Sequence, residues 1–217
     1  MSYKAVLFDL DGTLLDTIDD LTDSMNHALA QLGLPPRTPA ECKFFVGDGI
    51  VAYAERAMGK AGEDQDLLSR CIALSRAEYS RRWAIKTRPY DGIPELLDEL
   101  VRRGLKMTVL SNKPDDFTKL MVARLLPKWH FELVWGESPQ RTKKPDPTSA
   151  IQMATDLALQ PEEFLYLGDT NTDMQTAVLA GMYPVGVLWG FRPAEELLEN
   201  GAKVLIEHPM DTLKLLE

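Results

Sequence analysis

The sequence has few of the residues that stabilise secreted proteins or bind zinc. Its 217 residues include two cysteines, Cys42 and Cys71, and three histidines, His27, His130 and His208. The cysteines lack a CxxC spacing, so we expect reduced packing thiols in a cytosolic protein. The histidines are scattered along the chain, and no imidazole-based zinc site is predicted.

Long apolar runs and an excess of positive charge are also missing. No apolar run approaches the roughly 18 residues that span a bilayer, and the stretch 5–8 ends at Asp9, too early for a signal peptide. The net charge of −9 disfavours a nucleic acid or an anionic membrane as the main partner. A small anionic substrate is compatible with it, because a local cation can reverse the field inside a cleft. We expect a cytoplasmic protein, either a monomer or a homodimer.

Helices and strands are expected to alternate over most of the chain. Residues 3–8 form a short apolar run typical of a buried strand. Further strands are expected over 106–110, 131–135, 164–167, 183–188 and 203–206. Helices are expected over 93–103, 115–126, 147–159, 171–180 and 193–200. This alternation predicts an α/β fold, a Rossmann-like parallel sheet with helices on both faces.

The segment between the first two strands has a different character. Helical spacing over 18–32, a capped helix start at 38–41 and an amphipathic stretch over 64–83 predict helices, and no strand is expected between about residues 15 and 86. We therefore predict a core of residues 1–14 and 89–217 and a small inserted α-helical cap domain, 15–88. A helical lobe on two linkers can close over a cleft like a lid.

Polar side chains gather where ligands bind to open α/β sheets, beyond the carboxyl ends of the strands. The candidates there are Asp9 with Asp11, Ser111 with Asn112, Lys143 with Lys144, and Asp169 with Asp173. Two carboxylates about 4 Å apart cost roughly 4 kcal/mol at an effective dielectric of 20, so such a cluster needs a cation or shared protons. Oxygen ligands suit Mg²⁺, which also binds phosphate oxygens. The sequence thus predicts magnesium-assisted phosphoryl chemistry.

Each group fits a step of that chemistry. Asp9 can attack phosphorus and form an aspartyl phosphate, and Asp11 can protonate the leaving alcohol and later activate water. Lys144 can act as a point charge on a phosphoryl oxygen, and the Ser111 hydroxyl can bind another. Gly12 lets the backbone turn close to the ligand.

Simpler explanations exist for several of these residues. A DxD sequence on a loop is often only a turn or a helix cap, and Ser111 with Asn112 could merely cap the next helix. Asp173 falls in the first turn of a helix, where a carboxylate is favourable anyway. We expect it to orient the site from a second layer, with direct metal ligation as the alternative.

Four ordered motifs resemble those of the haloacid dehalogenase superfamily, and the similarity covers essentially the whole chain. The motifs are Asp9-Leu10-Asp11-Gly12-Thr13-Leu14, Ser111-Asn112, Lys144-Pro145 and Gly168-Asp169-Thr170-Asn171-Thr172-Asp173. The resemblance implies that Asp9 is the nucleophile and a magnesium ligand. It implies that Asp11 is the acid/base, with its backbone carbonyl on the metal, and that Asp169 binds magnesium. Phosphate would be bound by Gly12, Ser111, Asn112 and Lys144.

Further stretches look like the phosphoglycolate phosphatase branch of that superfamily. They are residues 9–17, 46–49, 89–92 and 168–181. The branch implies magnesium-dependent hydrolysis of a small phosphorylated metabolite, 2-phosphoglycolate, with substrate selection by the cap. Candidates for that selection are Gly47, Asp48 and Gly49 in one loop, with Lys43 and Arg56 as partners for a substrate carboxylate.

Other functions stay open from the sequence. Within the superfamily they are a sugar phosphate mutase similar to β-phosphoglucomutase, a phosphonatase and a pyrophosphatase. The dehalogenase branch lacks the second acid, so the presence of Asp11 disfavours it. A signalling receiver module also uses strand-end carboxylates, magnesium and a lysine, but its shorter chain would lack the insertion. A binding-only homologue is the last alternative.

Overall fold

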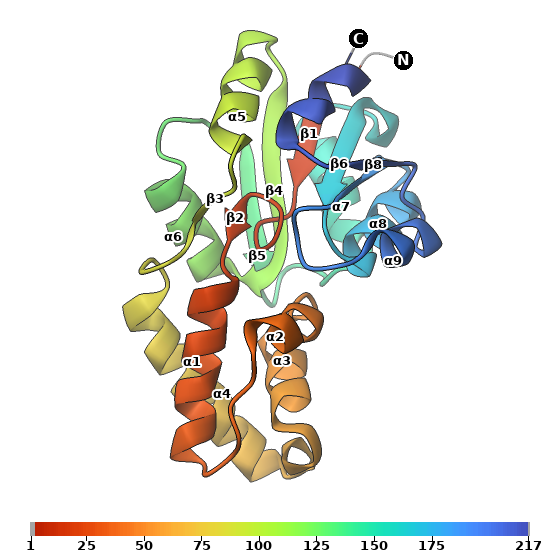
Figure 1. Ribbon diagram of the computed structural model, residues 1–217. Helices are drawn as coiled ribbons and strands as arrows, with labels where there is room; N and C mark the ends of the chain where they lie inside the picture. The colour runs from red at the N-terminus through yellow and green to blue at the C-terminus, as the bar shows by residue number, and fades with distance from the viewer. Residues whose placement is uncertain (1–2, 217) are drawn as a thin grey trace. The chain divides into compact units, whose positions relative to one another are not determined.

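The computed structural model describes residues 3–216, and the chain divides into two compact units (Figure 1). One unit comprises Met1–Leu15 and Pro89–Glu217, and the other comprises Asp16–Arg88. No helix within residues 3–216 is long and apolar enough to cross a membrane.

The first unit is built on a parallel sheet. Among the described residues this sheet has six strands in the order β5-β4-β1-β6-β7-β8, and every neighbouring pair is parallel. The strands are β1 (Ala5–Phe8), β4 (Lys106–Pro114), β5 (Leu133–Glu137), β6 (Phe164–Gly168), β7 (Tyr183–Val187) and β8 (Val204–Ile206). The predicted α/β fold with a parallel sheet is therefore confirmed.

Helices pack on both faces of this sheet (Figure 1). They are α5 (Ile93–Arg102), α6 (Asp115–Leu125), α7 (Thr148–Asp156), α8 (Asn171–Ala180) and α9 (Ala194–Glu199), with the 3₁₀ helices η2 (Pro161–Glu163) and η3 (Pro209–Leu215). Leu7 and Tyr166 pack with Met153 and Ala177 of α7 and α8 in one buried cluster. Because side chains alternate along a strand, the equally buried Phe8 faces the opposite side. Both faces of the sheet are thus apolar and covered, as parallel sheets require.

The strand order explains where polar residues meet. β1 lies between β4 and β6, so the chain moves outward on one side of β1 and then returns to the other. Phe8 is in register with Val109 on β4 and with Leu167 on β6. The residues that follow these strands therefore meet at one edge of the sheet. Ligands of open α/β sheets bind at such a reversal of strand order.

Several element boundaries differ from the prediction. β4 continues to Pro114, with an irregularity after Leu110, whereas the polar residues there indicated that the strand would end. β5 begins two residues later than expected, and α7 is shorter because Ala158 adopts a positive φ of 54° just beyond it. The expectation of no strand near residue 15 was wrong: β2 (Leu15–Asp16) pairs with β3 (Arg88–Pro89). Two-residue strands carry no periodic signal.

The second unit is helical. Its elements are α1 (Ile18–Gln31), α2 (Pro39–Phe45), α3 (Gly49–Met58), the 3₁₀ helix η1 (Gly59–Glu63) and α4 (Gln65–Arg82). α1 packs along α4, with the buried Cys71 against Met25. The predicted helix start at residue 38 is confirmed, since Glu41 N–H donates to Thr38 Oγ1 while the Glu41 carboxylate accepts from Thr38 N–H. Both cysteines are free and buried.

A buried carboxylate fixes the point where the chain leaves this unit. Asp20 Oδ2 accepts hydrogen bonds from the backbone N–H groups of Lys86 and Thr87 and from the Thr87 hydroxyl, each at 2.9 Å. Asp20 is completely buried. The first turn of α1 and the residues after α4 are therefore joined by three hydrogen bonds to one side chain.

Candidate active site

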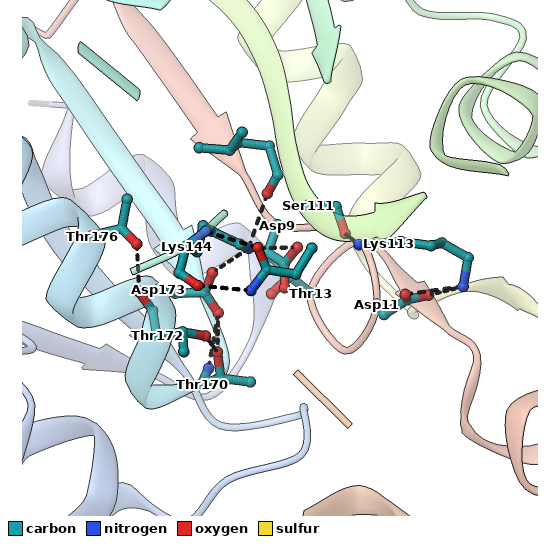
Figure 2. Close-up of polar contacts among 12 residues, drawn as sticks. Asp9, Asp11, Thr13, Ser111, Lys113, Lys144, Thr170, Thr172, Asp173 and Thr176 are labelled. Carbon is teal, nitrogen blue, oxygen red and sulfur yellow. Dashed lines mark hydrogen bonds and ion pairs between the residues drawn. The ribbon is translucent and has the colours of Figure 1, made fainter. Parts of the chain in front are cut away.

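A buried lysine lies between two buried carboxylates at the carboxyl edge of the sheet (Figure 2). Lys144 Nζ is 2.9 Å from Asp9 Oδ1 and 2.7 Å from Asp173 Oδ1. It also donates to the Leu110 carbonyl at 3.0 Å. Lys144, Asp9 and Asp173 are each less than 9 % exposed. Residues from three distant parts of the sequence thus form one charged cluster that is almost fully buried.

Asp169 completes the group of buried acids. Its Oδ1 accepts from the Thr13 hydroxyl at 2.8 Å, and its Oδ2 accepts from the Phe191 N–H at 2.9 Å. Gly12 has a φ of 87°, and a Cβ there would lie 2.2 Å from Asp169 Oδ2. A Cβ at Gly190 would lie equally close to Asp169 Cβ. The backbone therefore closes around this carboxylate in a way that larger residues at positions 12 and 190 would prevent.

The three acids can hold a metal ion. One oxygen each of Asp9, Asp169 and Asp173 lies within 4.8 Å of the others, and all three residues are buried. Asp9 Oδ1 lies at ion-pair distance from Lys144 Nζ. Among residues 3–216, however, no donor meets the geometry of a hydrogen bond to this oxygen. A buried carboxylate oxygen without a hydrogen bond is costly. A cation would satisfy it, and an all-oxygen donor set suits a hard divalent ion.

The Asp11 side chain does not join this group. Both of its oxygens accept from Lys113 Nζ, at 3.0 and 3.2 Å, to one side of the Asp9 cluster (Figure 2). This differs from the expectation that the Asp11 carboxylate would crowd together with Asp9 and Asp169. Asp11 lies in the loop after β1, and there the Lys113 ammonium offers its carboxylate a separate partner. The resemblance assigns the Asp11 backbone carbonyl, and not its carboxylate, to the metal. The position of the side chain does not affect that assignment, which stays a prediction.

The two residues of the second motif lie at different places. The Ser111 hydroxyl accepts from the Lys113 N–H at 3.2 Å (Figure 2). The Asn112 amide instead holds the backbone of Lys144: its Nδ2 donates to the Lys144 carbonyl at 3.0 Å, and its Oδ1 accepts from the Lys144 N–H at 2.8 Å. Asn112 thus fixes the lysine loop, which is a different use from the phosphate binding predicted from the sequence.

Asp173 is held by its neighbours as well as by Lys144. Its Oδ2 accepts from the Thr170 N–H at 3.1 Å and the Thr170 hydroxyl at 2.6 Å, which caps the start of α8. Its Oδ1 also accepts from the Tyr166 hydroxyl at 3.3 Å. Both oxygens are therefore occupied by protein donors, so this carboxylate is better placed to orient Lys144 than to bind a metal.

Sequence reasoning missed several groups that contact the acids. They are Thr13, Lys113, Tyr166, Thr170 and the Phe191 N–H. Thr13 and Thr170 lie inside recognised motifs, so proximity could have suggested them. The contribution of Phe191 is a backbone N–H, which no side-chain pattern reveals.

Burial and the repulsion of neighbouring charges raise the pKa values of Asp9 and Asp169. The pKa of Asp9 rises to about 7, first through burial and then through the charge of Asp173, against the attraction of Lys144. Burial, followed by the charges of Asp173 and Asp9, raises the pKa of Asp169 well above its usual range. Burial alone would lower the pKa of Lys144, but the two neighbouring carboxylates raise it well above the usual value. The metal-free site therefore favours the protonated forms of Asp9 and Asp169 beside a charged lysine.

These shifts predict how the stability of the metal-free protein depends on pH. An unfolded aspartate loses its proton near pH 4, whereas Asp9 keeps its proton up to about pH 7 in the folded state. The folded state binds more protons across that window, so the free energy of unfolding falls as pH rises. Glu99, a partly exposed acid whose pKa is lowered to about 2 by hydrogen bonds from Arg102 and Arg103, titrates below this pH window. We expect the metal-free Tm to fall between pH 5 and pH 8.

Calorimetry in a chelator and in Mg²⁺ checks this prediction. Metal ligands must be deprotonated to bind, so added Mg²⁺ should raise Tm more at pH 8 than at pH 5. A metal-free Tm that rises over the same range would contradict the assigned proton uptake at Asp9 and Asp169.

The residues predicted to select substrate belong to the helical unit. Gly47 and Gly49 adopt φ values of 129° and 84° and flank Asp48 at the start of α3. Arg56 binds within the same unit, with one nitrogen 2.5 Å from Asp48 Oδ2 and another donating to the Phe45 carbonyl at 2.9 Å. Lys43 lies half-buried on α2. Their role in binding a substrate stays a prediction.

Comparison with known proteins places this arrangement in a family. Residues 6–187 match the model described as haloacid dehalogenase-like hydrolase. The chain is 32 % identical to a phosphoglycolate phosphatase of Nitrosospira multiformis, over 100 % of this chain and 97 % of the relative. It is also 32 % identical to an N-acetylmuramic acid 6-phosphate phosphatase of Pseudomonas aeruginosa, over 100 % and 96 %. A crystal structure from Lactobacillus delbrueckii, named provisionally as a phosphoglycolate phosphatase, superposes with a TM-score of 0.93 at 31 % identity and covers 100 % and 99 % of the two chains.

Proposed function

The chain belongs to the haloacid dehalogenase-like hydrolases, and on that premise we propose that it is a phosphatase that hydrolyses 2-phosphoglycolate with Mg²⁺, through a phosphorylated Asp9. It is an enzyme of the phosphoric monoester hydrolase class, and its substrate is a small phosphorylated metabolite. The observation that carries the proposal is the buried cluster of Asp9, Lys144, Asp169 and Asp173 at the reversal of strand order. We place its activity in the cytoplasm, where its free cysteines would stay reduced.

The first step follows from the position of Asp9. One Asp9 oxygen attacks phosphorus, the bond from phosphorus to the ester oxygen breaks, and Asp11 supplies the proton that the leaving alcohol takes up. Lys144, fixed by Asp173 and by the Leu110 carbonyl, places a positive charge beside Asp9. That charge would stabilise the equatorial phosphoryl oxygens as negative charge moves onto them.

The second step uses the same residues, with Asp11 now acting as a base. Water attacks phosphorus, Asp11 accepts its proton, and the bond from phosphorus to Asp9 breaks to release phosphate. The buried Ser111 hydroxyl of β4 would bind one phosphoryl oxygen. Asn112 contributes by holding the Lys144 backbone in place.

The acid group fits a magnesium ion. We propose that Asp9, Asp169 and the Asp11 carbonyl bind it, while Asp173 orients Lys144. When bound, the ion neutralises charge on the phosphoryl oxygens and on the carboxylates. Thr13 and the Phe191 N–H fix Asp169 for this purpose. We also propose that the helical unit, Asp16–Arg88, serves as a cap that influences the choice of substrate.

A panel of phosphorylated metabolites, ranked by kcat/KM with and without Mg²⁺, tests this function. We expect 2-phosphoglycolate to rank first and the metal-free reaction to be negligible. If N-acetylmuramic acid 6-phosphate ranked first, the substrate would be that of the other relative, and the class of reaction would stand. Turnover of a sugar 1-phosphate without net release of phosphate would indicate a mutase instead. No turnover of any ester would remove the proposal altogether.

A further inference from the structure

Lys113 is a buried cation that the proposed chemical steps do not use. Its side chain is 5 % exposed, and its ammonium is 3.0 and 3.2 Å from the two oxygens of Asp11. Figure 2 shows this pair on the opposite side of Ser111 from Lys144, so the two lysines serve different carboxylates. Lysine is rarely buried to this degree unless it is paired. Its position therefore calls for a role beyond surface solvation.

The backbone of Lys113 is fixed at several points. Its N–H donates to Ser111 Oγ at 3.2 Å, and its carbonyl accepts from the Thr118 hydroxyl at 3.2 Å. A Cβ at Gly136 would lie 2.5 Å from the Lys113 carbonyl oxygen, so β5 packs directly against this residue. These contacts set the direction in which the side chain leaves β4 and bring its ammonium to Asp11.

The role proposed for Asp11 locates the Lys113 ammonium relative to a substrate. The acid that protonates the leaving group must lie within hydrogen-bond reach of the ester oxygen. Lys113 Nζ, at hydrogen-bond distance from that acid, would then lie near the leaving group. An ammonium group has three N–H donors. It can therefore bind Asp11 and a second anion together, or bind the second anion in place of Asp11.

On this basis, and resting on the function proposed above, we infer that Lys113 selects phosphate esters whose leaving group carries a carboxylate next to the ester carbon. In 2-phosphoglycolate this carboxylate is only two bonds from the ester oxygen. A bond from Lys113 to it would hold the ester oxygen beside Asp11. In a hexose 6-phosphate no negative charge lies at this distance, and Lys113 would gain no partner. Lys113 lies in the same unit as Asp9, whereas Arg56 and Lys43, the residues predicted from the sequence to bind a substrate carboxylate, lie in the helical unit.

A substrate comparison with Lys113 variants tests the inference. The substrates are 2-phosphoglycolate and 2-hydroxyethyl phosphate, which replaces the carboxylate with a neutral hydroxymethyl group. The variants are Lys113→Met, Lys113→Gln and Lys113→Arg, with Lys143→Met as the control. Lys143 is a partly exposed neighbour of Lys144 whose ammonium is 4.0 Å from Glu137. Circular dichroism and Tm confirm that each variant folds.

We expect both esters to react more slowly in Lys113→Met and Lys113→Gln, because Asp11 loses its partner. In addition, the preference for 2-phosphoglycolate, measured as the ratio of its kcat/KM to that of 2-hydroxyethyl phosphate, should fall about 10- to 100-fold. This is the effect expected for the loss of a charged hydrogen bond. Lys113→Arg should keep most of the preference, and Lys143→Met should keep all of it. An unchanged ratio in Lys113→Met and Lys113→Gln would overturn the inference, since a purely structural role slows both esters equally.

A binding measurement separates this inference from the proposed function. In the Asp9→Asn background with Mg²⁺, calorimetry gives Kd for both esters without turnover. We expect tighter binding of 2-phosphoglycolate, and loss of that difference when Lys113→Met is added. If the wild type hydrolysed no ester, the proposed function would fail, and this difference would still decide the role of Lys113. Equal affinity for both esters, or no binding of either, would overturn the inference.

Discussion

Replacing Asp9 with asparagine is expected to lower kcat for 2-phosphoglycolate by at least about 10⁴-fold, because the amide cannot form the phosphorylated intermediate. The same change removes a buried carboxylate whose pKa is raised to about 7. The metal-free variant should therefore unfold at a higher temperature than the wild type at pH 8, and its Tm should depend less on pH. Phosphate release and calorimetry measure the two effects.

The control for this prediction is Asp116→Asn, which removes an exposed carboxylate of the same unit at the start of α6. It should leave both activity and Tm close to the wild type. Activity of Asp9→Asn within tenfold of the wild type would refute the proposed nucleophile. A drop in metal-free Tm at pH 8 would refute the repulsion among the buried acids.

Replacing Lys144 with methionine should damage both the fold and the activity. The methionine fills a similar volume but leaves Asp9, Asp169 and Asp173 buried without their lysine. Removing one partner of a buried ion pair costs about 3–5 kcal/mol. Without the Lys144 charge the pKa of Asp9 rises further, so the loss of Tm should be larger at pH 8 than at pH 5. We also expect kcat to fall by at least about 10³-fold, since a charge on the phosphoryl group is lost.

Lys143→Met serves as the matched control, because Lys143 is adjacent in sequence and partly exposed. A surface ion pair is worth at most about 1 kcal/mol, so its Tm should change little. If Lys144→Met lost no more stability than Lys143→Met, the buried cluster would not depend on the Lys144 charge. A ligand that binds only the folded state stabilises any variant that still binds it, so the effect of Mg²⁺ is compared between the two variants. Added Mg²⁺ should raise the Tm of Lys144→Met by more than it raises the Tm of Lys143→Met.

The sequence was sufficient for the sheet and for the residues that follow its strands. Apolar runs such as Ala5–Phe8 are long enough to be recognised, and their order predicts which strand ends meet. It was not sufficient for β2 and β3, which are two residues long, or for the extension of β4 through polar residues to Pro114. These elements depend on pairing between distant segments, which leaves no periodic pattern in either one.

The same distinction applies to the site. The sequence identified Asp9, Lys144 and Asp169 as residue types suited to phosphoryl chemistry. It did not reveal that Asn112 binds the Lys144 backbone or that Lys113 pairs with Asp11, because both depend on the direction of side chains on an irregular strand. Single residues with ordinary surface composition acquire a role only when the backbone places them beside a specific partner.

Chemical trapping of the intermediate tests the nucleophile most directly. The protein is mixed with substrate and Mg²⁺, quenched in the first turnover and reduced with borohydride, which converts an aspartyl phosphate to homoserine. Peptide mass spectrometry then locates the modified residue. We predict homoserine at position 9 and at no other aspartate. Homoserine at another position, or turnover with no reducible aspartate, would contradict the assignment of Asp9.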